Sequence, residues 1–105
     1  MSKPVILAVD DDPQVLGAVR RDLRSQYGST YQIVAAGSGH EGLETVRELK
    51  RRSRTIAAFV VDQRMPQMTG TEFLLAAQEV YPQAKRLLLT CLLYTSDAAD
   101  DRPRV

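Results

Sequence analysis

Three acidic residues stand in a row directly after an apolar run near the start of the chain. Residues 5–9 read VILAV, and Asp10, Asp11 and Asp12 follow, before Pro13. At a separation of about 4 Å and an effective dielectric near 20, each like-charged pair costs on the order of 4 kcal/mol unless a cation, a proton or solvent relieves it. A buried segment that ends in this way therefore indicates that something offsets the repulsion.

Polar residues also end two later apolar segments. The segment TIAAFVVD ends in Asp62, and the segment KRLLLT ends in Thr90. Apolar runs without alternation are typical of strands buried on both faces of a parallel sheet, and ligands of such sheets bind outside the carboxyl ends of the strands. We therefore expect Asp10, Asp11, Asp62 and Thr90 to lie on one edge of a sheet.

A group of carboxylates at one edge has the chemistry of a magnesium site. Oxygen ligands favour Mg²⁺ or Mn²⁺ over zinc, and the sequence has no cluster of Cys and His. Mg²⁺ is often held together with phosphate oxygens, and a carboxylate beside it can act as a nucleophile that forms an aspartyl phosphate. Asp62 is the expected nucleophile because it stands alone on its strand, and Asp10 and Asp11 are the expected metal pair. Thr90 would offer its hydroxyl to a phosphoryl oxygen.

The hydropathy pattern places these residues in an alternation of strands and helices. Strands are predicted at residues 5–9, 31–36, 55–62 and 85–90. Apolar residues at helical spacing predict three helices between them: one from Pro13 to about Tyr27, one that ends in the basic run at residues 50–54, and one that stops before Pro82. The alternation with short connections predicts an α/β fold with a parallel sheet.

Length and composition limit the function classes. With 105 residues, of which 44% are hydrophobic, the chain is expected to form one domain with one modest core. The formal charge of +1 gives no overall electrostatic case for nucleic acid or an anionic membrane. Cys91, the single cysteine, excludes an internal disulfide, and neither a signal peptide nor a run of roughly 18 apolar residues is found. We therefore expect a cytoplasmic protein.

Several residues have simpler explanations than a functional one. Asp12 before Pro13 is typical of a helix N-cap, so we expect it to cap a helix and not to bind metal. The basic run at residues 50–54 complements a helix dipole, and we expect it to be solvated and not to bind nucleic acid. His40 is expected to be a solvated side chain.

Three segments together resemble a known family. VILAVDDDPQVL, VVDQRMPQMTG and LLLT occur in the same order and with similar spacing to the signature segments of the receiver domain of bacterial two-component response regulators. The resemblance covers residues 4–90. It implies a flavodoxin-like, doubly wound parallel sheet, which has five strands in the order 2-1-3-4-5 in that family.

The resemblance also implies roles for particular residues. Asp62 would be the phosphoacceptor, Asp10 and Asp11 would hold Mg²⁺, the backbone carbonyl of Arg64 would add a ligand, and Thr90 would contact the phosphoryl group. The implied function is a phosphorylation-dependent switch and not an enzyme. It would take a phosphoryl group from a sensor histidine kinase, and an effector domain would be fused to it in the full-length protein.

The last residues depart from the receiver pattern. After Thr90 only CLLYTSDAADDRPRV follows, without a further strand-like run or the lysine expected of a receiver. This stretch also resembles a translated sequencing adapter. We therefore expect residues 1–90 to be an incomplete receiver domain with strand order 2-1-3-4, its fifth strand and last helix missing, and residues 91–105 to be a non-native tail.

Two other function classes remain open from the residues. A haloacid-dehalogenase-like phosphohydrolase also begins with an apolar strand and a D-x-D motif, which Asp10 and Asp12 would match with Asp10 as the nucleophile. A degenerate receiver would bind a protein partner without being phosphorylated. Binding of a metal and of a phosphoryl analogue would separate this last class from an active receiver.

Overall fold

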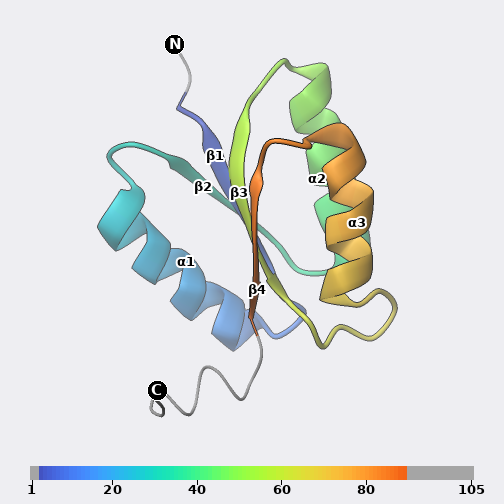
Figure 1. Cartoon of the computed structure of the whole chain (residues 1–105). Coiled ribbons are helices and arrows are strands. Elements are labelled where there is room, and N and C mark those ends of the chain that lie inside the picture. Colours follow the sequence, from blue (N-terminus) through green and yellow to red (C-terminus); the bar gives the residue numbers. More distant parts are fainter. Residues whose placement is uncertain (1–2, 90–105) are drawn as a thin grey trace, which may run out of the picture.

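The structure is a computed structural model that describes residues 3–89, and within this range four strands alternate with three helices (Figure 1). The strands and helices follow the order β1 (Val5–Val9), α1 (Pro13–Tyr27), β2 (Gln32–Ala36), α2 (Gly39–Arg51), β3 (Ile56–Asp62), α3 (Gly70–Val80) and β4 (Lys85–Leu89). The predicted alternation is therefore confirmed. Strands β2 and β3 each begin one residue later than the sequence pattern predicts.

The strands form one parallel sheet in the order β2-β1-β3-β4. Helix α1 covers one face of this sheet, and α2 and α3 lie side by side on the other, as Figure 1 shows. This is a flavodoxin-like arrangement, and the predicted order 2-1-3-4 is confirmed. Thr90 and the predicted non-native tail at residues 91–105 lie outside the described residues, so the expectation that the fifth strand and last helix are missing stays a prediction.

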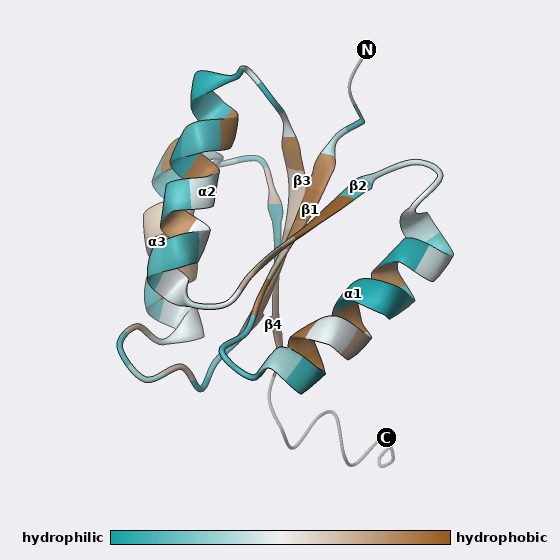
Figure 2. Ribbon diagram, turned by 180° about the vertical axis from the view of Figure 1, so that it is seen from behind, coloured by the Kyte–Doolittle hydropathy of each residue, from teal (hydrophilic) through white to brown (hydrophobic). Residues whose placement is uncertain are grey.

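The central strand β1 explains why its sequence is apolar without alternation. Val5, Leu7 and Val9 point into the core beneath α2 and α3, while Ile6 and Ala8 point into the core beneath α1. All five side chains are buried. The hydrophobic colouring of the strands and of the inward side of each helix in Figure 2 shows the same two layers. A strand covered on both faces needs an apolar residue at every position.

Each helix begins at the carboxyl edge of the sheet with a capping side chain. The Asp12 carboxylate accepts hydrogen bonds from the backbone N–H groups of Gln14 and Val15 at the start of α1, and the Ser38 hydroxyl caps α2. Thr69 and Glu72 form a reciprocal capping box at the start of α3. These caps fix where the loops that follow the strands must end, and those loops carry the polar residues.

Within residues 3–89, no helix is long and apolar enough to cross a membrane.

Candidate functional site

Three carboxylates meet at the carboxyl edge of the sheet. Asp10 directly follows β1, Asp11 comes next, and Asp62 is the last residue of β3. Strands β1 and β3 are neighbours, and their register pairs Val9 with Val61. One carboxylate oxygen from each aspartate therefore lies within 4.8 Å of the others. The structure thus brings together three of the residues that the sequence predicts for the site.

The environment of Asp10 makes its charge costly. Its exposed fraction is 5%, and this burial raises the pKa of the Asp10 carboxyl above its ordinary value. The backbone N–H of Asp12 donates to Asp10 Oδ1 at 2.9 Å and lowers the pKa, whereas the charges of Asp62 and Asp11 raise it further. The net direction is upward, so the carboxylate form of Asp10 is destabilised.

The pKa of the Asp62 carboxyl is also raised above its ordinary value. Burial again raises its pKa most strongly, and the neighbouring Asp11 carboxylate adds to the rise. A hydrogen bond from the backbone N–H of Arg64 and the charge of that residue act in the opposite direction. Among residues 3–89, the salt bridges involve Glu48 and not these aspartates. The acidic cluster, which we define as Asp10, Asp11 and Asp62, is therefore short of positive charge.

The shortage of positive charge around the acidic cluster favours the binding of a divalent cation. Three oxygen donors lie close together, and Asp10 and Asp62 are withdrawn from water to different degrees, whereas Asp11 is exposed. Burial, followed by neighbouring carboxylates, raises the pKa values of Asp10 and Asp62. A hard cation relieves the repulsion between the carboxylates and uses their oxygens as ligands. The donor set suits Mg²⁺, which is commonly held by one or two carboxylates and completes its shell with water or phosphate oxygens.

Asp12 belongs to the helix cap, as predicted. Both hydrogen bonds that its carboxylate accepts come from the first turn of α1, and the distance from the backbone nitrogen of Gln14 is 2.9 Å. It is also not among the three carboxylates that converge. This use of Asp12 is unfavourable to the phosphohydrolase alternative, which requires Asp10 and Asp12 to act together.

The loop at residues 63–69 connects Asp62 to α3 and is anchored by its methionines. Met65 is buried, and Met68 packs against the core beneath α2 and α3. The Met68 side chain lies so close to Gly39 that a Cβ at this glycine would be 2.8 Å from its Sδ atom. The loop is therefore held against the start of α2. The predicted ligand role of the Arg64 carbonyl stays a prediction, as does the role of Thr90, which is outside the described residues.

Two residues near the site are not evident from the sequence pattern. A Cβ at Gly70 would lie 2.6 Å from the backbone oxygen of Asp62 and 2.6 Å from Leu88 Cδ1, so only glycine allows α3 to begin this close to the end of β3. The Gln63 side chain accepts hydrogen bonds from Thr71 at the start of α3. These contacts join residues that are eight or more positions apart, and no periodic signal marks them.

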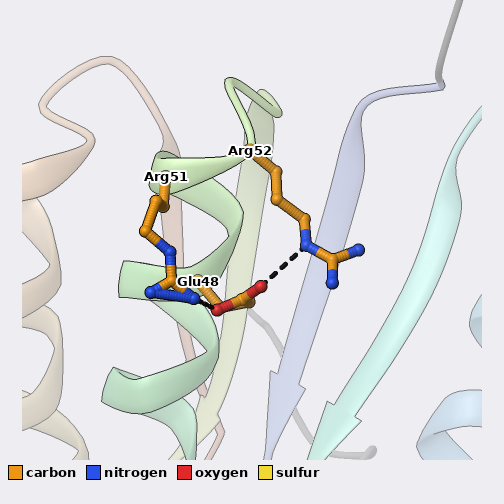
Figure 3. A network of polar contacts seen from close by, with 3 residues as sticks. All are labelled: Glu48, Arg51 and Arg52. Carbon is orange, nitrogen blue, oxygen red and sulfur yellow. Dashed lines mark hydrogen bonds and ion pairs between the residues drawn. The ribbon is translucent and has the colours of Figure 1, made fainter.

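The basic run that ends α2 is partly neutralised within its own helix. Glu48 forms ion pairs with Arg51 and Arg52, and the distance from Arg52 Nε to Glu48 Oε2 is 2.7 Å (Figure 3). The Arg54 guanidinium instead donates to the backbone oxygen of Lys3 at 3.0 Å and to Gln32 Oε1 at 2.5 Å. These local contacts favour a structural and solvated role for the run. His40, at the start of α2, is exposed, in agreement with the sequence prediction.

Comparison with known proteins decides the family. The model of the response regulator receiver domain family matches residues 6–100. The chain belongs to this family. The receiver domain is similar to part of the hydrogenase transcriptional regulatory protein HoxA of Cupriavidus necator, with 31% identity over 85 residues, which are 81% of this chain and 16% of HoxA. It is also 35% identical over 91 residues to the hybrid signal transduction histidine kinase D of Dictyostelium discoideum, covering 85% of this chain and 5% of that protein.

A solved structure agrees with the receiver fold. The response regulator protein TrrA of Thermotoga maritima, crystallised in complex with Mg²⁺-BeF, is 29% identical and superposes with a TM-score of 0.67. The alignment covers 93% of this receiver domain and 83% of TrrA. By contrast, the chain spans less than a fifth of the length of the two curated relatives, which are much longer proteins.

Proposed function

We propose that this receiver domain is a phosphorylation switch of two-component signal transduction that accepts a phosphoryl group on Asp62 with the help of Mg²⁺. The observation that carries the proposal is the convergence of Asp10, Asp11 and Asp62 within 4.8 Å at the carboxyl edge of the sheet. Membership of the receiver family supports the same reading.

Asp62 is proposed as the phosphoacceptor for geometric reasons. It is half-buried, whereas Asp10 is almost fully buried and already accepts the N–H of Asp12. A nucleophile needs access to an incoming phosphoryl donor, and the more exposed of these two carboxylates has it. The Asp62 oxygen would bond to phosphorus while the bond from phosphorus to the imidazole nitrogen of a kinase histidine breaks, which leaves an acyl phosphate and a free histidine.

Asp10 and Asp11 are proposed to hold the metal, with Asp62 and the backbone carbonyl of Arg64 as further ligands. Mg²⁺ would supply positive charge against the oxygens of the transferring group. Burial and neighbouring carboxylates raise the pKa values of Asp10 and Asp62, which supports a role for a cation at this position. Thr90, which follows Leu89 in the sequence, is proposed to contact a phosphoryl oxygen.

The proposed partners follow from the chemistry and the relatives. The phosphoryl donor would be a sensor histidine kinase in the cytoplasm, and one relative is itself a hybrid signal transduction histidine kinase. The other relative is a transcriptional regulatory protein of which the matched part is 16%, which supports a receiver that acts through an effector domain. The switch would change the state of that effector and would not turn over a substrate as an enzyme does.

The test is phosphorylation by a small donor. Because the receiver pattern places a lysine beyond Thr90, the experiment uses a version lengthened by a receiver-type fifth strand and helix. Acetyl phosphate with Mg²⁺ should add one phosphoryl mass to this protein and to its Asp12→Asn variant, and none to Asp62→Asn. Labelling that persists in Asp62→Asn and is lost in Asp10→Asn would support the phosphohydrolase alternative. Mg²⁺ binding without any labelling would indicate a degenerate receiver.

A further inference from the structure

Gln63, the residue after Asp62, makes hydrogen bonds to two different elements. Its backbone N–H donates to the carbonyl of Leu89 at the end of β4 at 3.0 Å, and its own carbonyl accepts the N–H of Gly70 at 3.2 Å. Its side-chain Oε1 accepts the N–H of Thr71 at 2.9 Å and the hydroxyl of Thr71 at 3.0 Å. Gln63 therefore joins the ends of β3 and β4 to the start of α3.

These bonds close the base of the loop at residues 63–69. The loop leaves β3 at Gln63 and returns to the same residue at Gly70 and Thr71, so its two ends are fixed together. Its middle is fixed separately by buried Met65 and by Met68 against Gly39. Arg64 lies directly after the closed base, and its backbone N–H bonds the Asp62 carboxylate, which partly opposes the rise in the pKa of Asp62 that burial causes.

The Gln63 side chain adds to the usual cap of α3. Thr69 already bonds the backbone N–H of Glu72, and the Glu72 side chain bonds the backbone N–H of Thr69. This capping box satisfies the helix start in the usual way. The Gln63 side chain serves the N–H of Thr71, which the capping box leaves free, and this acceptor comes from the strand end next to Asp62. The side chain therefore connects this strand end directly to α3.

We propose that Gln63 is a positioning residue that holds the Asp62–Arg64 segment in the orientation needed to bind the cation. This inference rests on the proposed function, because it assigns the bonds of Gln63 to the same site. Its backbone bond to Leu89 also ties the segment to the residue that precedes Thr90, so Gln63 relates the positions of the predicted phosphoacceptor and the predicted phosphoryl contact.

The test measures Mg²⁺ affinity in the full 105-residue chain, with MgCl₂ titrated by calorimetry. Gln63→Met keeps the length of the side chain and removes the acceptor, and we expect its dissociation constant to rise roughly tenfold, the usual scale for residues that orient metal ligands. Gln63→Glu keeps an oxygen that accepts both Thr71 donors, so it should bind Mg²⁺ at least as tightly as the wild type. Gln83→Met, an exposed glutamine before β4, is the matched control and should be unchanged.

The outcomes separate this inference from the proposed function. One outcome would overturn the inference and leave the proposed function standing. In it, the wild type and Gln63→Met bind Mg²⁺ with the same affinity, whereas Asp11→Asn no longer binds it. Equal weakening in Gln63→Met and Gln63→Glu would also overturn it, because the acceptor would not matter. A lower denaturation midpoint of metal-free Gln63→Met without any loss of affinity would mean a purely structural role. A wild type that does not bind Mg²⁺ would overturn both proposals.

Discussion

The carboxyl and amino edges of the sheet hold like charges in different ways. At the carboxyl edge, Asp10, Asp11 and Asp62 converge without an ion pair to a basic side chain among residues 3–89. At the amino edge, where α2 ends and β3 begins, Arg51 and Arg52 share the carboxylate of Glu48 (Figure 3). The basic charges are exposed and locally paired, whereas two of the three acidic groups are buried or half-buried, and burial with neighbouring carboxylates raises the pKa values of Asp10 and Asp62.

This difference separates a structural group of charges from a binding site. Exposed ion pairs on a helix are worth little and need no ligand, because water and the neighbouring residue already stabilise them. Buried like charges destabilise the fold, so their presence at one edge indicates a function that requires them. The predictions below change one edge at a time and begin with the largest expected effect.

The carboxyl edge depends on close packing at Gly70. Gly70→Ala places a methyl group 2.6 Å from the backbone oxygen of Asp62, so we expect the free energy of unfolding to fall by about 1–3 kcal/mol in urea titrations. Gly17→Ala in α1 is the control, because no atom lies within 4 Å of its new Cβ, and it should stabilise the fold by about 0.5–1 kcal/mol. Equal effects of the two substitutions would mean that α3 does not approach Asp62 this closely.

Removing one acidic charge should stabilise the metal-free protein. Burial raises the pKa of Asp10 above 3.8, so between that value and its folded pKa the native state binds more protons than the unfolded state. The stability of the wild type should therefore fall as the pH rises through this window and stay lower above it. Asp10→Asn should lack this fall and be more stable at pH 7 by on the order of 1 kcal/mol, the typical scale of a single substitution.

The wild type and Asp10→Asn also show whether the charge that destabilises the metal-free fold is used to bind Mg²⁺. Unfolding is measured with a chelator and again with excess Mg²⁺, which stabilises only a native state that binds it. The wild type should gain stability from Mg²⁺ and approach or exceed Asp10→Asn, which has lost a ligand. A wild type that is already the more stable protein in chelator would contradict the view that Asp10 is held in an unfavourable charged state.

Much of this site follows from the sequence because its residues end apolar segments. Asp10 directly follows one strand and Asp62 ends another, the pattern marks both strands clearly, and parallel strands bring their carboxyl ends together. The Asp12 cap is local, so Asp12 before Pro13 was enough to predict it. The bonds of Gln63 and the close approach of Gly70 depend instead on how β3, α3 and β4 pack. Such contacts carry no periodic signal, and the sequence pattern therefore missed them.

Asp12 lies beside the acidic cluster but should behave as a cap. Asp12→Ala removes the acceptor for the first turn of α1 and should cost about 1 kcal/mol of unfolding free energy. Asp12→Asn keeps an acceptor and should lose much less. Both variants should bind Mg²⁺ with nearly wild-type affinity, whereas Asp11→Asn should not. A loss of affinity in Asp12→Asn as large as in Asp11→Asn would make Asp12 part of the site.

A substitution at the amino edge of the sheet should change the free energy of unfolding least. Glu48→Gln removes both ion pairs at the end of α2, where Glu48 is 40% exposed and the arginines are 69–72% exposed. We expect a loss below about 0.5 kcal/mol that shrinks further at high salt, because exposed pairs are weak and screened. Chemical denaturation with urea at low and high ionic strength measures it. A loss larger than that of Asp12→Ala would remove the contrast between the two edges.

The most direct test of the central claim is to find the residue that carries the phosphoryl group. The lengthened protein is treated with acetyl phosphate and Mg²⁺, and borohydride then reduces any acyl phosphate to homoserine, which peptide mass spectrometry locates. The account predicts homoserine at position 62 and unmodified Asp10 and Asp11. Homoserine at position 10 would contradict it, because the buried residue would then be the nucleophile and Asp62 only its neighbour.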